Sequence, residues 1–161
     1  MGILANFAVA VLLTAVAPAA FAQQAAVEPA VAMKTGRDLF EKSCRLCHGL
    51  DRALATTRDA PAWGLLVKRM VAYGAPLDVD QRALVVRYLA TRSSFARACG
   101  GCHELTRAVS DTPRQRDWVA IAKRMAVHVR EFEKQGKAPA GVTLPPEEVA
   151  DIAALLQAVI P

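Results

Sequence analysis

Apolar residues recur every three or four positions in several segments of the chain, which is the spacing of amphipathic helices. In the first half these segments are residues 37–43, 63–73 and 83–89, and in the second half they are residues 93–98, 118–131 and 149–159. No segment shows the strict alternation of apolar and polar residues that is typical of a half-buried strand. The pattern therefore predicts an all-α protein with about three helices in each half.

The two halves are copies of one another. Residues 37–73 align with residues 92–128 at a constant shift of 55, and 13 of the 37 positions are identical. A repeat of this kind indicates that each half is one structural unit. Further along, residues 77–81 resemble residues 144–148 at a shift of 67, so the second half carries 12 extra residues. We place them in a loop within residues 130–142, where glycine and proline gather.

The chain thus divides into two tandem domains, residues 35–90 and residues 91–161. Ala90 and Thr91 alone separate the last helix of the first domain from the first helix of the second. With almost no linker, the two domains are expected to pack closely. A unit of about 60 residues buries little apolar surface and usually needs a metal, disulfides or a cofactor for stability.

Each half contains one Cys-x-x-Cys-His motif, CRLCH at residues 44–48 and CGGCH at residues 99–103. This motif is the signature of covalent haem attachment. The two cysteines form thioethers with the two vinyl groups of a haem, and the histidine that follows binds the iron. We therefore expect two haem c groups, held by Cys44, Cys47, His48, Cys99, Cys102 and His103.

Other sites can be built from the same cysteines. Structural zinc favours a shorter gap between the two pairs, and it leaves the histidine after each pair unexplained. A thioredoxin-like redox pair needs a βαβ context, which is missing from the pattern. Two disulfides are a third alternative in an oxidising compartment. Haem is the reading that accounts for both histidines and for the repeat.

The sixth iron ligand is expected from the second helix of each half. Met70 lies 22 residues after His48, and Met125 lies 22 residues after His103. Methionine is a common sixth ligand of cytochromes c and raises their reduction potential. The alternative is that both methionines only fill gaps in a core. His128 lies one turn from Met125 on the same helix face, so it is an alternative ligand for the second haem.

Trp63 and Trp118 occupy equivalent positions of the repeat, seven residues before the two methionines. We expect these tryptophans to pack against the haems or to bond a propionate through the indole N–H. The alternative is that they are ordinary core residues, since buried tryptophan usually finds a partner for its N–H.

The motifs CRLCH…W…KRM and CGGCH…W…KRM together resemble dihaem cytochromes c built from two small cytochrome c domains. The pattern is similar to the dihaem domain of quinohaemoprotein amine dehydrogenase and to cytochrome subunits of periplasmic dehydrogenases. The resemblance covers residues 35–161 and implies a cytochrome c-like helical fold around each haem. It also implies electron transfer toward a respiratory oxidase. Ordinary class I cytochromes place the methionine ligand later, in a loop that lacks methionine here, so Met70 and Met125 take that role.

The N-terminal residues read as an export signal. Residues 3–20 are almost wholly apolar, and Ala20-Phe21-Ala22 supplies the small residues that a signal peptidase reads. We predict a signal peptide over residues 1–22 and a flexible arm over residues 23–34. The protein is then periplasmic, and it is associated with the membrane only if the segment is retained as an anchor.

The 161 residues carry a formal charge of +5, which the propionates of two haems largely offset. The positive charge is therefore poor evidence for nucleic-acid binding, and we expect none. We expect an electron carrier without substrate chemistry of its own, serving a periplasmic dehydrogenase, a cytochrome or an oxidase. The alternative is a dihaem peroxidase or oxidase with one open haem site.

Overall fold

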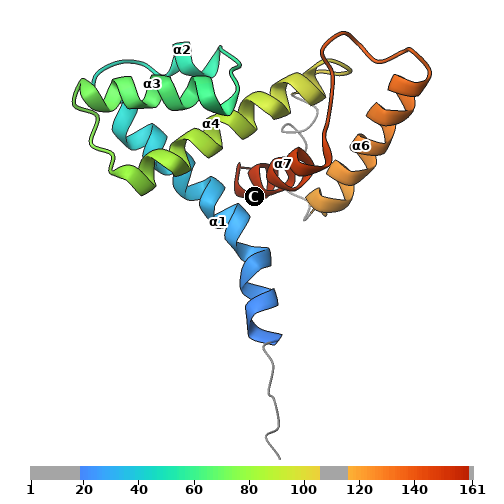
Figure 1. Ribbon diagram of the computed structural model, residues 1–161, viewed down its shortest axis with the longest axis horizontal. Coiled ribbons are helices and arrows are strands. Elements are labelled where there is room, and N and C mark those ends of the chain that lie inside the picture. Colours follow the sequence, from blue (N-terminus) through green and yellow to red (C-terminus); the bar gives the residue numbers. More distant parts are fainter. Residues whose placement is uncertain (1–18, 106–115, 160–161) are drawn as a thin grey trace, which may run out of the picture.

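The computed structural model describes residues 19–105 and 116–159, and every regular element in these two ranges is an α-helix. The helices are α1 (Ala19–Cys44), α2 (Asp51–Leu54), α3 (Ala60–Ala72), α4 (Val79–Gly100), α6 (Trp118–Lys134) and α7 (Pro146–Val159) (Figure 1). The all-α prediction is confirmed for this part of the chain. Each predicted helix coincides with part of an observed one, and the single turn α2 is additional.

Three helices begin at an aspartate that satisfies a free backbone N–H. The side chain of Asp59 accepts from the N–H of Ala62 at 2.9 Å, and that of Asp117 accepts from Ala120 at the same distance. Asp78 and Gln81 form a reciprocal capping box at the start of α4. Each such cap contributes about 1 kcal/mol to stability, so local sequence sets where α3, α4 and α6 start.

Helix α1 is much longer than the predicted helix over residues 37–43. It includes residues 23–34, which we expected to form a flexible arm. The reason is that alanine favours helix and that Met33, with 0% of its surface exposed, anchors this turn in the core. Further along, Gly36 lies against the backbone carbonyl of Leu84 where α1 crosses α4, and a Cβ there would overlap it.

Helix α4 joins the two halves without a break. We expected two helices separated at Ala90 and Thr91, but one 22-residue helix spans residues 79–100. No glycine or proline interrupts the sequence between Val79 and Cys99, so nothing in the local chemistry stops the helix. The first part of α4 therefore belongs to the first half, and its last part leads into the second Cys-x-x-Cys-His motif.

Two apolar cores lie on either side of α7. One core is formed mainly by α1, α3 and α4 and the other mainly by α6, α7 and the loop before α7. Helix α7 packs against α1, α4 and α6, and its faces are divided between the two cores. Leu155 belongs to the first core, whereas Ile152 and Leu156 belong to the second. The last helix of the predicted second domain thus also stabilises the first.

The predicted loop within residues 130–142 is present in part: α6 continues to Lys134, and the loop between α6 and α7 begins at Gln135. Gly136 and Gly141 have positive φ angles of 66° and 77°, a conformation that favours glycine. Most of the predicted signal peptide lies outside the described residues. Among the helices that the structure does describe, none has the length and apolar character needed to cross a bilayer.

Candidate functional site

The first Cys-x-x-Cys-His motif lies in the turn that follows α1. Cys44 is the last residue of that helix and is half-buried, while Cys47 and His48 are exposed. The ring Nδ1 of His48 lies 2.8 Å from the carbonyl oxygen of Gly49. Immediately afterwards Leu50 is buried in the first core, which fixes the end of the turn.

The second motif lies in the corresponding turn, at the end of α4. Cys99 is in the last turn of the helix and is half-buried, and Cys102 is exposed. The half-buried His103 has its Nδ1 at 3.3 Å from the carbonyl oxygen of Glu104. The structure therefore gives the two motifs the same helix-to-turn geometry, as the repeat predicts.

The histidine contacts have a chemical consequence. A carbonyl oxygen only accepts, so in each ring Nδ1 carries the proton and donates it. The lone pair is then left on Nε2, the nitrogen that can bind a metal. Histidine ligands are commonly held in this way, with the non-ligating N–H bonded to a carbonyl that fixes the tautomer and the ring. His48 and His103 are thus both prepared to act as ligands through Nε2.

All four cysteines are free thiols, and disulfides, one alternative from the sequence, are not formed. Burial raises the pKa of the Cys99 thiol to about 11, and the neighbouring Cys102 adds to this. The same two causes, burial and then Cys47, raise the pKa of Cys44. Reactive cysteines of redox pairs have lowered pKa values instead. The raised pKa values of Cys44 and Cys99 therefore differ from those of a reactive redox pair.

The predicted sixth ligands lie on α3 and α6. Met70 and Met125 are both half-buried, so neither is simply a core residue or a surface residue. Beyond them, Tyr73 is 76% exposed, and its counterpart His128 is also exposed. Along each helix, the methionine follows a buried tryptophan by seven residues and precedes an exposed Tyr73 or His128 by three. Which of Met125 and His128 serves the second haem stays a prediction.

The two tryptophans are buried, and each carries an arginine over its ring. The guanidinium carbon of Arg58 lies 5.8 Å from the centre of the Trp63 ring, and that of Arg116 lies 5.6 Å from the centre of the Trp118 ring. Such a cation–π contact contributes roughly 0.5–1 kcal/mol at an exposed site. Both tryptophans therefore lie in apolar cores, and their predicted contact with the haems stays a prediction.

Ser93 is a buried residue that the sequence did not single out. Its Oγ accepts from the indole N–H of Trp63 at 3.0 Å and from the backbone N–H of Arg58 at 3.2 Å. The hydroxyl donates in turn to the carbonyl of Leu89 at 2.9 Å. The Trp63 N–H therefore already donates to a protein acceptor, so in this structure it is not free to donate to a haem propionate. Ser93 joins α3 to the middle of α4.

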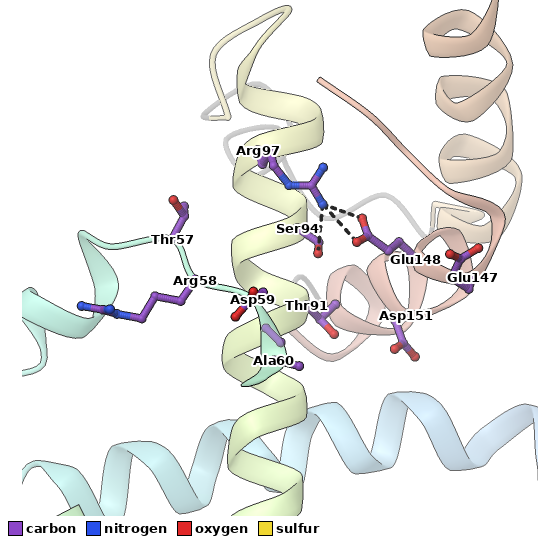
Figure 2. A pocket seen from close by; sticks show the side chains of 11 residues that line it. Thr57, Arg58, Asp59, Ala60, Thr91, Ser94, Arg97, Glu147, Glu148 and Asp151 are labelled. Carbon is purple, nitrogen blue, oxygen red and sulfur yellow. Dashed lines mark hydrogen bonds and ion pairs between the residues drawn. The ribbon is translucent and has the colours of Figure 1, made fainter. Parts of the chain in front are cut away.

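A polar cleft of about 510 Å³ lies between the loop before α3, the middle of α4 and the start of α7. Figure 2 shows Arg97 reaching from α4 to Glu148 on α7, with Ser94 beside it. Both carboxylate oxygens of Glu148 bind this guanidinium, at 3.0 and 2.9 Å. None of the predicted haem-attachment residues lines this cleft.

Among the described residues, no group of three or more histidine, cysteine, aspartate or glutamate side chains is arranged to hold a metal ion. No family model, no curated protein and no solved structure matches this chain.

Proposed function

We propose that the protein is a periplasmic dihaem cytochrome c that passes single electrons from a donor such as a dehydrogenase to a downstream cytochrome or oxidase. The observation that carries the proposal is the pair of equivalent helix-to-turn motifs, in which His48 and His103 each have Nδ1 held by a backbone carbonyl. Two exposed and two half-buried thiols accompany them. The all-helical fold is the fold expected of such a protein.

The residues have distinct roles in this proposal. The cysteine pairs hold the cofactor covalently, and His48 and His103 bind iron through Nε2. Met70 supplies the sixth ligand in the first half, and Met125 or His128 supplies it in the second. A haem bound at each site exchanges one electron between ferrous and ferric iron. The chain fixes the two sites relative to one another through α4, which belongs to both halves.

A pyridine haemochrome assay on the exported protein tests the proposal directly. We expect two haem c groups per chain, and one per chain in each of the variants Cys44→Ser/Cys47→Ser and Cys99→Ser/Cys102→Ser. Mass spectrometry of the exported chain checks the processing and should find Gln23 at its amino terminus. Fewer than two haems c in the unaltered protein would overturn the proposed function.

The sixth ligands are tested by spectroscopy of the oxidised protein. We expect Met70→Ala to abolish the methionine–iron absorption band of the first haem, and Met125→Ala to abolish that of the second. If His128 is the second ligand, only His128→Ala perturbs that haem. Rapid binding of carbon monoxide or turnover of peroxide by the unaltered protein would instead favour the dihaem peroxidase alternative, because that activity needs one open iron position.

A further inference from the structure

The surroundings of the first Cys-x-x-Cys-His turn differ from those of the second in charge and exposure. At the shift of 55 that relates the halves, Lys42, Arg45 and Leu46 correspond to Arg97, Gly100 and Gly101. In the first half all three of these side chains are exposed, and Leu46 is 68% exposed. The two cations and the leucine form what we call the first-turn surface.

At the same positions the second half presents no such side chains, although Gly100 and Gly101 are themselves exposed. Val142, in the loop with the extra residues, is buried and occupies the space that a Cβ on Gly101 would need. Arg97 is held by that loop, because it donates to the carbonyl and hydroxyl oxygens of Thr143 at 3.1 and 2.7 Å. It also binds Glu148 (Figure 2). At these three positions the second half therefore has neither an unpaired cation nor an exposed apolar side chain.

The first-turn surface carries a surplus of positive charge. Two neighbouring carboxylates are paired along α1, Asp38 with Lys34 at 2.6 Å and Glu41 with Arg37 at 3.0 Å. Lys42 and Arg45, by contrast, have no ion pair with the described residues. Two hollows of about 450 and 580 Å³ meet at Arg45, and the larger one is also lined by the cationic Arg37 and Arg92. The carboxylates of Glu41 and Asp51 line the larger hollow as well, so its three arginines exceed its acidic residues by one.

We propose that the first-turn surface is the docking site of a redox protein whose contact face has carboxylates around an apolar centre. Such a partner removes Leu46 from water while its carboxylates meet Lys42 and Arg45. Apolar centres with charged rims are usual in protein interfaces, and complementary charge raises the association rate. The chain then exchanges electrons with this partner through its first half, because the three equivalent positions of the second half lack these exposed side chains. The inference rests on the proposed function.

The probe for this site is a zinc-substituted cytochrome c, used either unmodified and basic or with its lysines succinylated and acidic. On excitation the zinc porphyrin gives one electron to a ferric haem of the chain, which leaves a porphyrin cation radical and a ferrous haem. The triplet lifetime therefore measures the rate of encounter. At low salt we expect the acidic probe to be quenched about tenfold faster than the basic one, with the difference lost at high salt.

The variants separate docking at this surface from an effect of net charge. Lys42→Glu/Arg45→Glu should reverse the preference between the two probes. Arg130→Glu/Lys137→Glu changes the net charge equally at exposed positions elsewhere and should alter the rates less than twofold. Equal effects of the two double variants would overturn the inference. The single variant Lys42→Glu changes a residue outside the motif and replaces the double variant if Arg45→Glu impairs haem attachment. It should lower the quenching rate of the acidic probe about threefold.

Cross-linking gives a readout that does not depend on electron transfer. A carbodiimide condenses the Lys42 amine with a succinyl carboxylate into an amide, while the carbodiimide takes up the water and becomes a urea. We expect Lys42 to be the principal cross-linked lysine of the chain. Cross-links centred on Lys134 and Lys137 would overturn the inference while two haems per chain leave the proposed function standing. A chain without haem fails the haemochrome assay instead.

Discussion

In the first half, α1 crosses α4 so closely that Gly36 has no room for a side chain, whereas its repeat counterpart Thr91 carries one and is buried. In the second half, the close approach lies elsewhere, where Gly101 meets Val142. The counterpart of Gly101 is the exposed Leu46. The two halves therefore share the helices, the tryptophans and the Cys-x-x-Cys-His motifs, but their closest backbone contacts lie at different positions. The first half has its close contact where α1 crosses α4, and the second has it at the turn of the motif.

The largest expected effect comes from the helix crossing of the first half. Gly36→Ala forces a Cβ against the Leu84 carbonyl, which belongs to a helix backbone and cannot rotate away. We expect a loss of about 3 kcal/mol in the free energy of unfolding, measured by denaturant titration of the holoprotein. Gly64→Ala is the matched control, because nothing lies within 4 Å of its Cβ and it is inside α3. Gly64→Ala should instead raise the free energy of unfolding by about 0.5–1 kcal/mol. A neutral Gly36→Ala would contradict the close crossing.

The contact over the second turn should have a smaller effect. Gly101→Ala overlaps the Val142 side chain, which can shift more easily than backbone. We expect Gly101→Ala to lower the free energy of unfolding by about 2 kcal/mol. Leu46→Ala, at the equivalent exposed position, is the control and should change it by less than about 0.5 kcal/mol. A double-mutant cycle with Val142→Ala checks the pairing, since a favourable coupling appears only if the two residues touch. Additive effects would show that the loop does not cover the turn.

The buried hydroxyl of Ser93 should have the smallest of the three effects. Ser93→Ala leaves the Trp63 indole N–H and the Arg58 backbone N–H without their acceptor. Buried donors left unpaired cost roughly 1–3 kcal/mol, and we expect the low end of that range because the Arg58 amide lies near the surface. Ser94→Ala on the same helix is the control and should be within about 0.5 kcal/mol of the original. If the two variants were equally stable, the hydrogen bonds of Ser93 would not contribute to the packing of α3 against α4.

Local patterns were enough to predict most helices and to find the two Cys-x-x-Cys-His motifs, because each depends on residues close in sequence. The apolar spacing located α3 and α6, and the repeat placed His48 and His103 in equivalent turns. The contacts that distinguish the halves depend on segments far apart in sequence. Nothing local indicates that Ser93 meets Trp63, or that Leu155 of α7 enters the first core.

One signal of the asymmetry was present in the sequence. Arg45 and Leu46 in the first motif are replaced by Gly100 and Gly101 in the second, and the second half has extra residues. Paired glycines often mark a place where another segment approaches the backbone. The length of α1 was missed for a similar reason, because the burial of Met33 depends on helices that follow much later.

Helix α4 has a consequence for how the protein can be divided. A helix of 22 residues is roughly 33 Å long, and a cut near residue 90 leaves half of it on each fragment. Each fragment then exposes apolar surface that α4 and α7 had covered. Although the sequence is a tandem duplication, neither copy is expected to survive proteolysis or separate expression alone. The two copies should unfold in a single transition, and only the two together are expected to form a stable folding unit.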